Sequence, residues 1–114
     1  MAVAAAAMLA VAGCGSPAQP AGSIKVTMTE FQFVPSSIPA PSGKVVFFLV
    51  NSGTTSHNMI IRDSANRRVK GSDLVSAGDS SVFTVDNIPA GTYTIFCDQQ
   101  GHEASGMKGT LTIT

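Results

Sequence analysis

Three side chains that can bind a soft metal ion follow one another at equal steps near the end of the chain. In the segment CDQQGHEASGM, steps of five residues separate Cys97, His102 and Met107. Glycines interrupt this segment, so a loop between two strands, rather than one face of a helix, must bring the three side chains together. A fourth side chain of this kind is His57, the only other histidine of the chain.

Together these residues offer one thiolate, two imidazoles and one thioether. Three strong ligands in a trigonal plane with a weak axial methionine are typical of a blue copper site. Cu(I) prefers sulfur and Cu(II) accepts imidazole nitrogen, so a rigid site of this composition lets the metal change its charge with little rearrangement. We therefore predict one type 1 copper ion that exchanges single electrons, with the ligands His57, Cys97, His102 and Met107.

Each ligand also has an ordinary explanation, because an isolated cysteine or methionine is most often a buried apolar side chain. The copper hypothesis is favoured because the set uses both histidines and Cys97, the only cysteine besides Cys14 at the end of the N-terminal apolar run. Cysteine and two histidines also suit Zn²⁺, so a zinc-bound or metal-free interaction module stays an alternative. The main alternative is a copper transport or delivery protein with the same fold, although the chain has no Met-rich or His-rich tail.

The first 13 residues form an apolar run rich in alanine and valine, which has the length of a signal peptide. A membrane-spanning helix needs about 20 residues, so a multi-pass membrane protein is excluded. Val11-Ala12-Gly13-Cys14 resembles a bacterial lipobox, in which the cysteine carries the lipid. We predict a signal peptide over 1–13, lipidated Cys14 with a flexible linker over 14–23, and the folded domain over 24–114. The alternative is an ordinary secretory signal with an incidental cysteine.

A lipid at Cys14 implies an exported protein on the outer face of the cytoplasmic membrane, on its periplasmic or extracellular side. Cys97 is then the only thiol of the exported domain, and it has no partner for an intramolecular disulfide. A single thiol without a disulfide partner needs another role in an oxidising compartment, and metal binding supplies one.

From Ile24 onward, short strand patterns alternate with turn residues, and no helix period appears. Residues 24–33 change the parity of their apolar positions, which predicts one strand with a β-bulge. The run VVFFLV predicts a strand buried on both faces. Further strands are expected over 57–61, 80–85, 92–97 and 109–114, with breaks at 51–53, 86–87 and 89–91. Six or seven strands of this kind predict an all-β fold, an antiparallel β-sandwich.

Two segments leave alternatives open. Tyr93 stands near a strand start, where it indicates either a tyrosine corner or plain core packing. Residues 62–74 are polar and irregular, and they predict a short helix or a loop. The basic residues of this segment favour a solvated connection over a docking patch.

The overall composition excludes several classes of function. Seven Lys and Arg balance seven Asp and Glu, so a nucleic-acid partner is not expected. A hydrophobic content of 44% with six phenylalanines argues against disorder. With no third histidine, the chain cannot build a Ser-His-Asp triad or a second copper site, so we expect no catalysis. We expect a monomer that meets redox partner proteins.

The sequence resembles the cupredoxin family of small blue copper proteins, which includes plastocyanins and azurins. The resemblance lies in TEFQFVPSSI, in the buried strand ending in NSG, in His57-Asn58, and in GTYTIFC with GHEASGMKGTLTI. It implies a Greek-key β-sandwich with copper near one end, bound through Nδ1 of both histidines. It also implies that Asn58 places its backbone N–H near the Cys97 sulfur and pins the ligand loop with its side chain. Gln100 stands where many relatives have proline.

The loop geometry also predicts where electrons leave the site. Cys97 follows a strand and should be buried, whereas the ring edge of His102 should reach the surface. The neighbouring loop residues form a small, nearly neutral patch that suits brief contact with a partner. The competing route is electrostatic docking through Arg67, Arg68 and Lys70.

Overall fold

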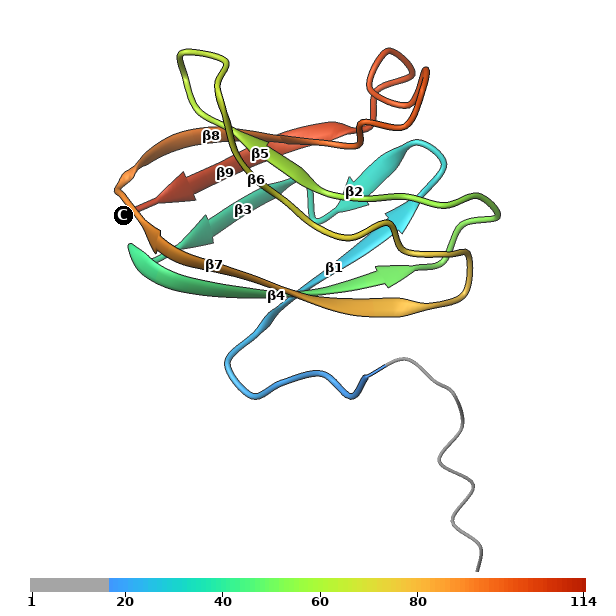
Figure 1. Cartoon of the computed structure of the whole chain (residues 1–114), viewed down its shortest axis with the longest axis horizontal. Coiled ribbons are helices and arrows are strands. Elements are labelled where there is room, and N and C mark those ends of the chain that lie inside the picture. The colour runs from blue at the N-terminus through green and yellow to red at the C-terminus, as the bar shows by residue number, and fades with distance from the viewer. Residues whose placement is uncertain (1–16) are drawn as a thin grey trace, which may run out of the picture.

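The computed structural model describes residues 17–114, which form two β-sheets packed face to face (Figure 1). The first sheet has the order β2-β1-β4-β7, with β1 (Ile24–Thr29), β2 (Gln32–Val34), β4 (Gly43–Asn51) and β7 (Ser80–Ile88). The second has the order β3-β9-β8-β5-β6, with β3 (Ser37–Ala40), β5 (Ile60–Arg62), β6 (Arg68–Gly71), β8 (Gly91–Phe96) and β9 (Lys108–Ile113). The predicted all-β sandwich is confirmed. No described segment is a helix long and apolar enough to cross a membrane.

Both sheets are mixed, whereas the sequence predicted antiparallel pairing throughout. β1 runs parallel to β4, and β3 runs parallel to β9. After β2 the chain passes into the second sheet as β3 and then returns to the first as β4. β4 therefore reaches β1 by a crossover instead of a hairpin, and a crossover is the connection that parallel strands require.

The predicted β-bulge within residues 24–33 is wrong. The chain reverses at Glu30 and Phe31, so β1 and β2 form a hairpin in which Met28 pairs with Phe33. Both side chains are buried and lie opposite each other on one face of the hairpin. The change of parity in the sequence therefore reflects a turn back along the sheet.

The other predicted strands are present, although some begin or end at other residues than the sequence predicted. The centre of β4 is buried on both faces, because Phe47, Phe48 and Leu49 are each at most 8% exposed. β7 continues through the predicted break at 86–87, where its register against β4 shifts and Asn87 has a positive φ of 53°. The polar segment 62–74 holds no helix; it contains the turn of the β5–β6 hairpin and the edge strand β6.

The hydrophobic core lies between the two sheets and extends to the predicted ligands. Phe47 and Phe83 stack at its centre, with ring centroids 5.8 Å apart. Cys97 and Met107 belong to the same buried cluster. Tyr93 forms the tyrosine corner, because its hydroxyl donates to the carbonyl oxygen of Pro89 at 2.8 Å. The core and this corner give the ligands a fixed frame.

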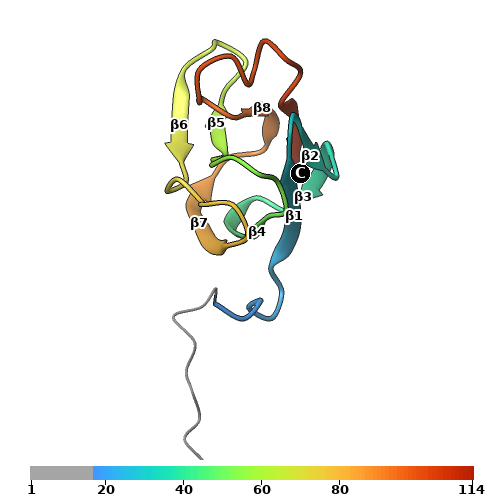
Figure 2. The ribbon, with the colours of Figure 1, turned by 90° about the vertical axis from the view of Figure 1, so that its right-hand side faces the viewer.

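Three connections meet at one end of the sandwich, on the right of Figure 1 and toward the viewer in Figure 2. They are the β1–β2 turn, the segment between β4 and β5, and the loop between β8 and β9. The C-terminus lies at the opposite end (Figure 1). The predicted ligands come from two of these connections.

The N-terminal predictions fall mostly outside the described residues, including the signal peptide over 1–13 and the lipidation site at Cys14. In the described part of the predicted linker, Pro20 and Ser23 form a turn, with the Ser23 N–H and hydroxyl both donating to the Pro20 carbonyl. β1 begins at Ile24. The division of the chain into signal, linker and domain stays a prediction.

Candidate metal centre

The backbone places the four predicted ligands at the ends of strands. Cys97 directly follows β8, Met107 directly precedes β9, and His102 lies in the loop between them. His57 lies before β5, where its N–H and carbonyl pair with the carbonyl and N–H of Val75 at 3.1 and 2.8 Å. The backbone of the sandwich therefore fixes the positions of both segments that carry ligands.

Three of the donor atoms form a compact triangle. Nδ1 of His57 lies 3.2 Å from Nδ1 of His102, and Sγ of Cys97 lies 4.0 Å from the first nitrogen and 3.4 Å from the second. A point inside this triangle is about 2.1 Å from all three atoms, close to the bond lengths of a transition metal to nitrogen and sulfur. The donor set and its trigonal arrangement fit copper.

Met107 closes the same loop at its other end. Its side chain is fully buried, its N–H donates to the carbonyl of His102 at 3.0 Å, and its carbonyl accepts the N–H of Cys97 at 3.2 Å. The thioether therefore belongs to the buried cluster that holds the thiolate. The four residues are positioned as a type 1 copper site.

The ligand loop is held in shape by its own backbone. Gly101 and Gly106 have positive φ angles of 80° and 106°, which other residues adopt only with strain. The N–H of His102 donates to the carbonyl oxygen of Gln99, and the N–H of Ser105 donates to the carbonyl oxygen of Gly101, both at 3.0 Å. These bonds order the loop, in which Gln100 stands where the family resemblance led us to expect proline.

The ligands differ in exposure, as the sequence predicts for Cys97 and His102. His57 and Cys97 are fully buried, whereas His102 is partly exposed. The ring of Phe31 meets the His102 ring edge to face, with centroids 5.1 Å apart, and is itself 40% exposed. His102 is therefore the part of the site that reaches the surface.

Asn58 connects the two ligand segments through its side chain. Its Nδ2 donates to the Asp98 carboxylate at 2.6 Å, and its Oδ1 accepts the Asp98 N–H at 3.0 Å. The residue after His57 is thus joined to the residue after Cys97. This geometry agrees with the pinning role expected from the family resemblance. The bond from the Asn58 backbone to the Cys97 sulfur stays a prediction.

Arg62 braces the loop from β5. Its guanidinium donates to both carboxylate oxygens of Glu103, at 3.1 and 2.5 Å, and lies 4.3 Å from the centroid of the Phe96 ring. The hydrogen bond from Arg62 lowers the pKa of Glu103. Phe96 directly precedes Cys97, and Glu103 directly follows His102. The Arg62 side chain therefore contacts both sides of the ligand loop.

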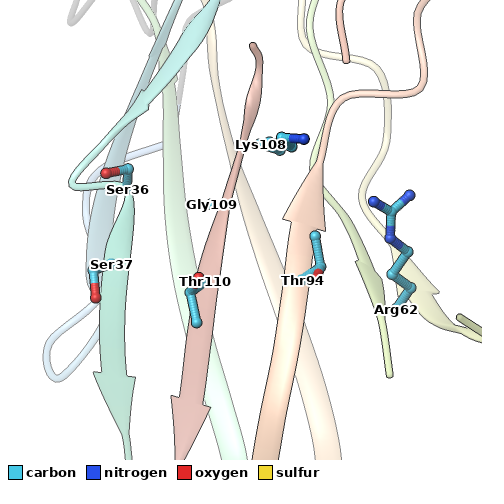
Figure 3. A pocket seen from close by; sticks show the side chains of 7 residues that line it. All are labelled: Ser36, Ser37, Arg62, Thr94, Lys108, Gly109 and Thr110. Carbon is cyan, nitrogen blue, oxygen red and sulfur yellow. The ribbon is translucent and has the colours of Figure 1, made fainter. Parts of the chain in front are cut away.

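Arg62 also borders an open, polar pocket of about 500 Å³ on the outer face of the second sheet (Figure 3). Four neighbouring strands and the turn before β3 line it, and Figure 3 shows hydroxyl side chains on three of these strands, with Lys108 above them and Arg62 on one side. The other lining residues are Ser36, Ser37, Thr94, Lys108, Gly109 and Thr110. None of them is a predicted ligand, so this pocket is separate from the metal centre.

Glu30 contacts the metal centre although the sequence analysis did not single it out. Its Oε1 lies 3.1 Å from Nε2 of His57. Hydrogen bonds from the backbone of Thr55 and then Thr54, opposed by partial burial, lower the pKa of Glu30 to about 2. The sequence did contain one signal that Glu30 has a special role: it is the only charged residue between Lys25 and Lys44.

Comparisons with known proteins agree with this geometry. The family described as "cupredoxin-like domain" matches residues 1–113. Plastocyanin of Scenedesmus fuscus is 33% identical over 88 residues, which cover 71% of this chain and 85% of that protein. The chain belongs to the cupredoxin family.

Solved structures share the fold. Auracyanin A from Chloroflexus aurantiacus, described as a "blue" copper protein, superposes with a TM-score of 0.72 at 20% identity, over 81% of this chain and 98% of that one. Oxidised plastocyanin from Dryopteris crassirhizoma superposes with a TM-score of 0.60 at 28% identity, over 79% and 99%. The two-sheet sandwich of this chain is therefore the fold of these proteins.

Cys97→Ser should abolish the intense visible absorption that we expect from the Cu(II) protein, because the thiolate is the donor of that charge-transfer transition. The measurement is a titration with Cu(II) followed by visible absorption, with circular dichroism to check the fold. Met107→Leu is the matched control: it removes the axial sulfur, should keep the colour and should raise the reduction potential. A wild-type protein that binds Cu(II) without colour would contradict the site.

Proposed function

We propose that this chain is an extracytoplasmic electron carrier that is tethered to a membrane by a lipid at Cys14. Bound copper supplies a one-electron Cu(II)/Cu(I) couple. The observation that carries the proposal is the triangle of His57, Cys97 and His102 donor atoms at a buried end of the sandwich. Membership of the cupredoxin family supports electron-carrier function.

The chain's own residues suit transfer of an electron without exchange of ligands. The strand ends and the backbone bonds of the loop fix the donor atoms, so little rearrangement should accompany a change of charge. Because His57, Cys97 and Met107 are fully buried, they leave little access for a substrate or for a protein that would take the metal. These features favour a carrier over an enzyme and over copper delivery.

A test with a Cu(I) chelator separates the carrier from the delivery hypothesis. The reduced protein, incubated with an excess of chelator, should keep its copper through repeated oxidation and reduction, because three ligands are inaccessible. Visible absorption after each reoxidation measures the copper retained. Rapid loss of copper to the chelator would favour the delivery protein.

The surface around His102 suits short-lived contact with a redox partner. Gly101, Ala104 and Gly106 are exposed, and the exposed ring of Phe31, which packs against His102, extends this apolar surface. Glu103 is paired with Arg62, so its charge is largely compensated. We infer that electrons pass through the edge of His102.

The basic segment is a weaker candidate for docking. Arg67 is paired with Asp63, and Lys70 donates to the Thr84 carbonyl. The tip of the β5–β6 hairpin also lies apart from the ligand loop in Figure 1. An electron that leaves through His102 would have no short route to a partner bound there.

Ala104→Lys should slow electron self-exchange by about one order of magnitude, because a long charged side chain obstructs the contact surface and is costly to desolvate. Self-exchange is measured by NMR line broadening in mixtures of oxidised and reduced protein, at low and high salt. The control is the double variant Arg67→Glu/Arg68→Glu, which should exchange at nearly the wild-type rate. A slower rate in the double variant, with strong salt dependence in the wild type, would move the docking surface to the basic segment.

The position of the N-terminal segment supports the tether. Ile24 and Thr29 are the two ends of β1, and Thr29 leads directly into Glu30 beside the metal centre. Six residues of strand span about 20 Å, so the chain leaves the sandwich well away from the ligands. A lipid upstream of β1 would therefore leave the surface around His102 free for a partner.

Cys14→Ser should release the protein from the membrane fraction or stop its processing, because the lipid has no other attachment in the predicted lipobox. Fractionation of cells that express each form, followed by visible spectra of the solubilised protein, makes the measurement. The copper spectrum should be unchanged, since the linker separates the anchor from the site. Equal membrane partitioning of the two forms would reject the lipobox.

A further inference from the structure

The inner histidine of the metal centre has a carboxylate partner that comes from a distant part of the sequence. Glu30 lies in the β1–β2 turn, and its Oε1 is 3.1 Å from Nε2 of His57. The His57 side chain is fully buried, whereas the Glu30 side chain is 27% exposed. The contact therefore joins a buried imidazole ring to a partly exposed turn at the end of the sandwich.

The same carboxylate oxygen accepts further hydrogen bonds, and these assign the proton on His57. Oε1 accepts the N–H groups of Thr54 and Thr55 at 2.7 and 2.8 Å, and the Thr55 hydroxyl at 3.0 Å. A backbone N–H can only donate, so Oε1 acts as an acceptor and the hydrogen between it and His57 belongs to Nε2. A neutral imidazole with its hydrogen on Nε2 has its lone pair on Nδ1. Nδ1 is the His57 atom in the donor triangle.

We propose that Glu30 is a positioning residue that fixes the tautomer and the ring orientation of His57 before metal binds. A hydrogen bond from a ligand imidazole to a carboxylate orients the ring and makes its other nitrogen a stronger donor. The proposal rests on the copper site and not on the carrier function, so it holds equally for a copper delivery protein.

The surroundings of Glu30 show that its carboxylate is held tightly in this place. A Cβ atom at Gly53 would come within 2.5 Å of Oε1, so only glycine allows the loop to approach this closely. Asn51, which is 1% exposed, accepts the Gly53 N–H at 2.9 Å and donates to the Thr55 carbonyl at 2.8 Å. The loop that binds Glu30 is thus itself braced.

Asn51 also connects this loop to the backbone of the ligand. Its Nδ2 donates to the Val75 carbonyl at 2.8 Å, and Val75 is the residue that pairs with His57. The backbone and the ring of His57 are consequently held by one continuous network. Among the described residues, no carboxylate has a hydrogen bond to the ring of His102, which packs against Phe31 instead. The two ligand histidines are positioned by different means.

The test is ¹⁵N NMR of the histidine rings in the metal-free protein, combined with titrations by Cu(II) and by Zn²⁺. The wild type should show His57 with its hydrogen on Nε2 only. Glu30→Ala should show a mixture of tautomers and bind both ions about 10- to 100-fold more weakly, which is the usual cost of losing such a partner. Glu30→Gln should restore the single tautomer, because its amide oxygen can accept the same hydrogen bonds.

Two further variants keep the test decisive. Gly53→Ala displaces the carboxylate and leaves every charge in place, so it should produce the same mixture of tautomers even if Glu30→Ala does not fold. Asp86→Asn removes an equal charge from an exposed position of β7, outside both ligand segments, and it should leave the His57 tautomer and both affinities unchanged. A single Nε2–H tautomer with wild-type affinities in folded Glu30→Ala or Gly53→Ala would overturn the proposal. It would do so whether or not the protein proves to be an electron carrier.

Discussion

The structure depends on holding one thiolate and two imidazoles in a small triangle at the end of a hydrophobic core. Polar groups in such a place are unfavourable unless each has a partner. Cys97 and His57 are fully buried, and a shift of either would separate donor atoms that lie 4.0 Å apart or less. The strand ends that carry these ligands therefore have to be fixed more firmly than an ordinary loop requires.

Different contacts meet this requirement on the two sides of the site. On the inner side, Glu30 binds the His57 ring and Asn58 joins the two ligand segments. On the outer side, Arg62 binds Glu103 and covers Phe96, so the loop is braced while the ring of His102 remains partly exposed. An electron can reach the surface through the exposed ring without movement of the buried ligands. Electron transfer benefits both from rigid buried ligands and from one ligand ring that a partner can approach.

The ligands were predictable from the sequence because the loop that carries three of them is continuous. Equal spacing from Cys97 to Met107, with both histidines in the set, indicated the chemistry before any fold was known. Glu30 was not predictable in this way, since its contact to His57 depends on a hairpin turn that the sequence pattern suggested was a bulge. The parallel pairing of β1 with β4 was missed for a related reason: apolar alternation shows which face of a strand is buried but not which strand lies beside it.

X-ray absorption at the copper edge, recorded on the oxidised and the reduced protein, tests the central claim most directly. If the chain holds the donor triangle rigidly, both forms should show one sulfur and two nitrogen neighbours of copper. Each copper–ligand distance should be nearly the same in the oxidised and the reduced form. Cys97→Ser should remove the short sulfur neighbour from both spectra. Loss of a nitrogen neighbour on reduction, or the absence of a short sulfur neighbour in the wild type, would contradict the account.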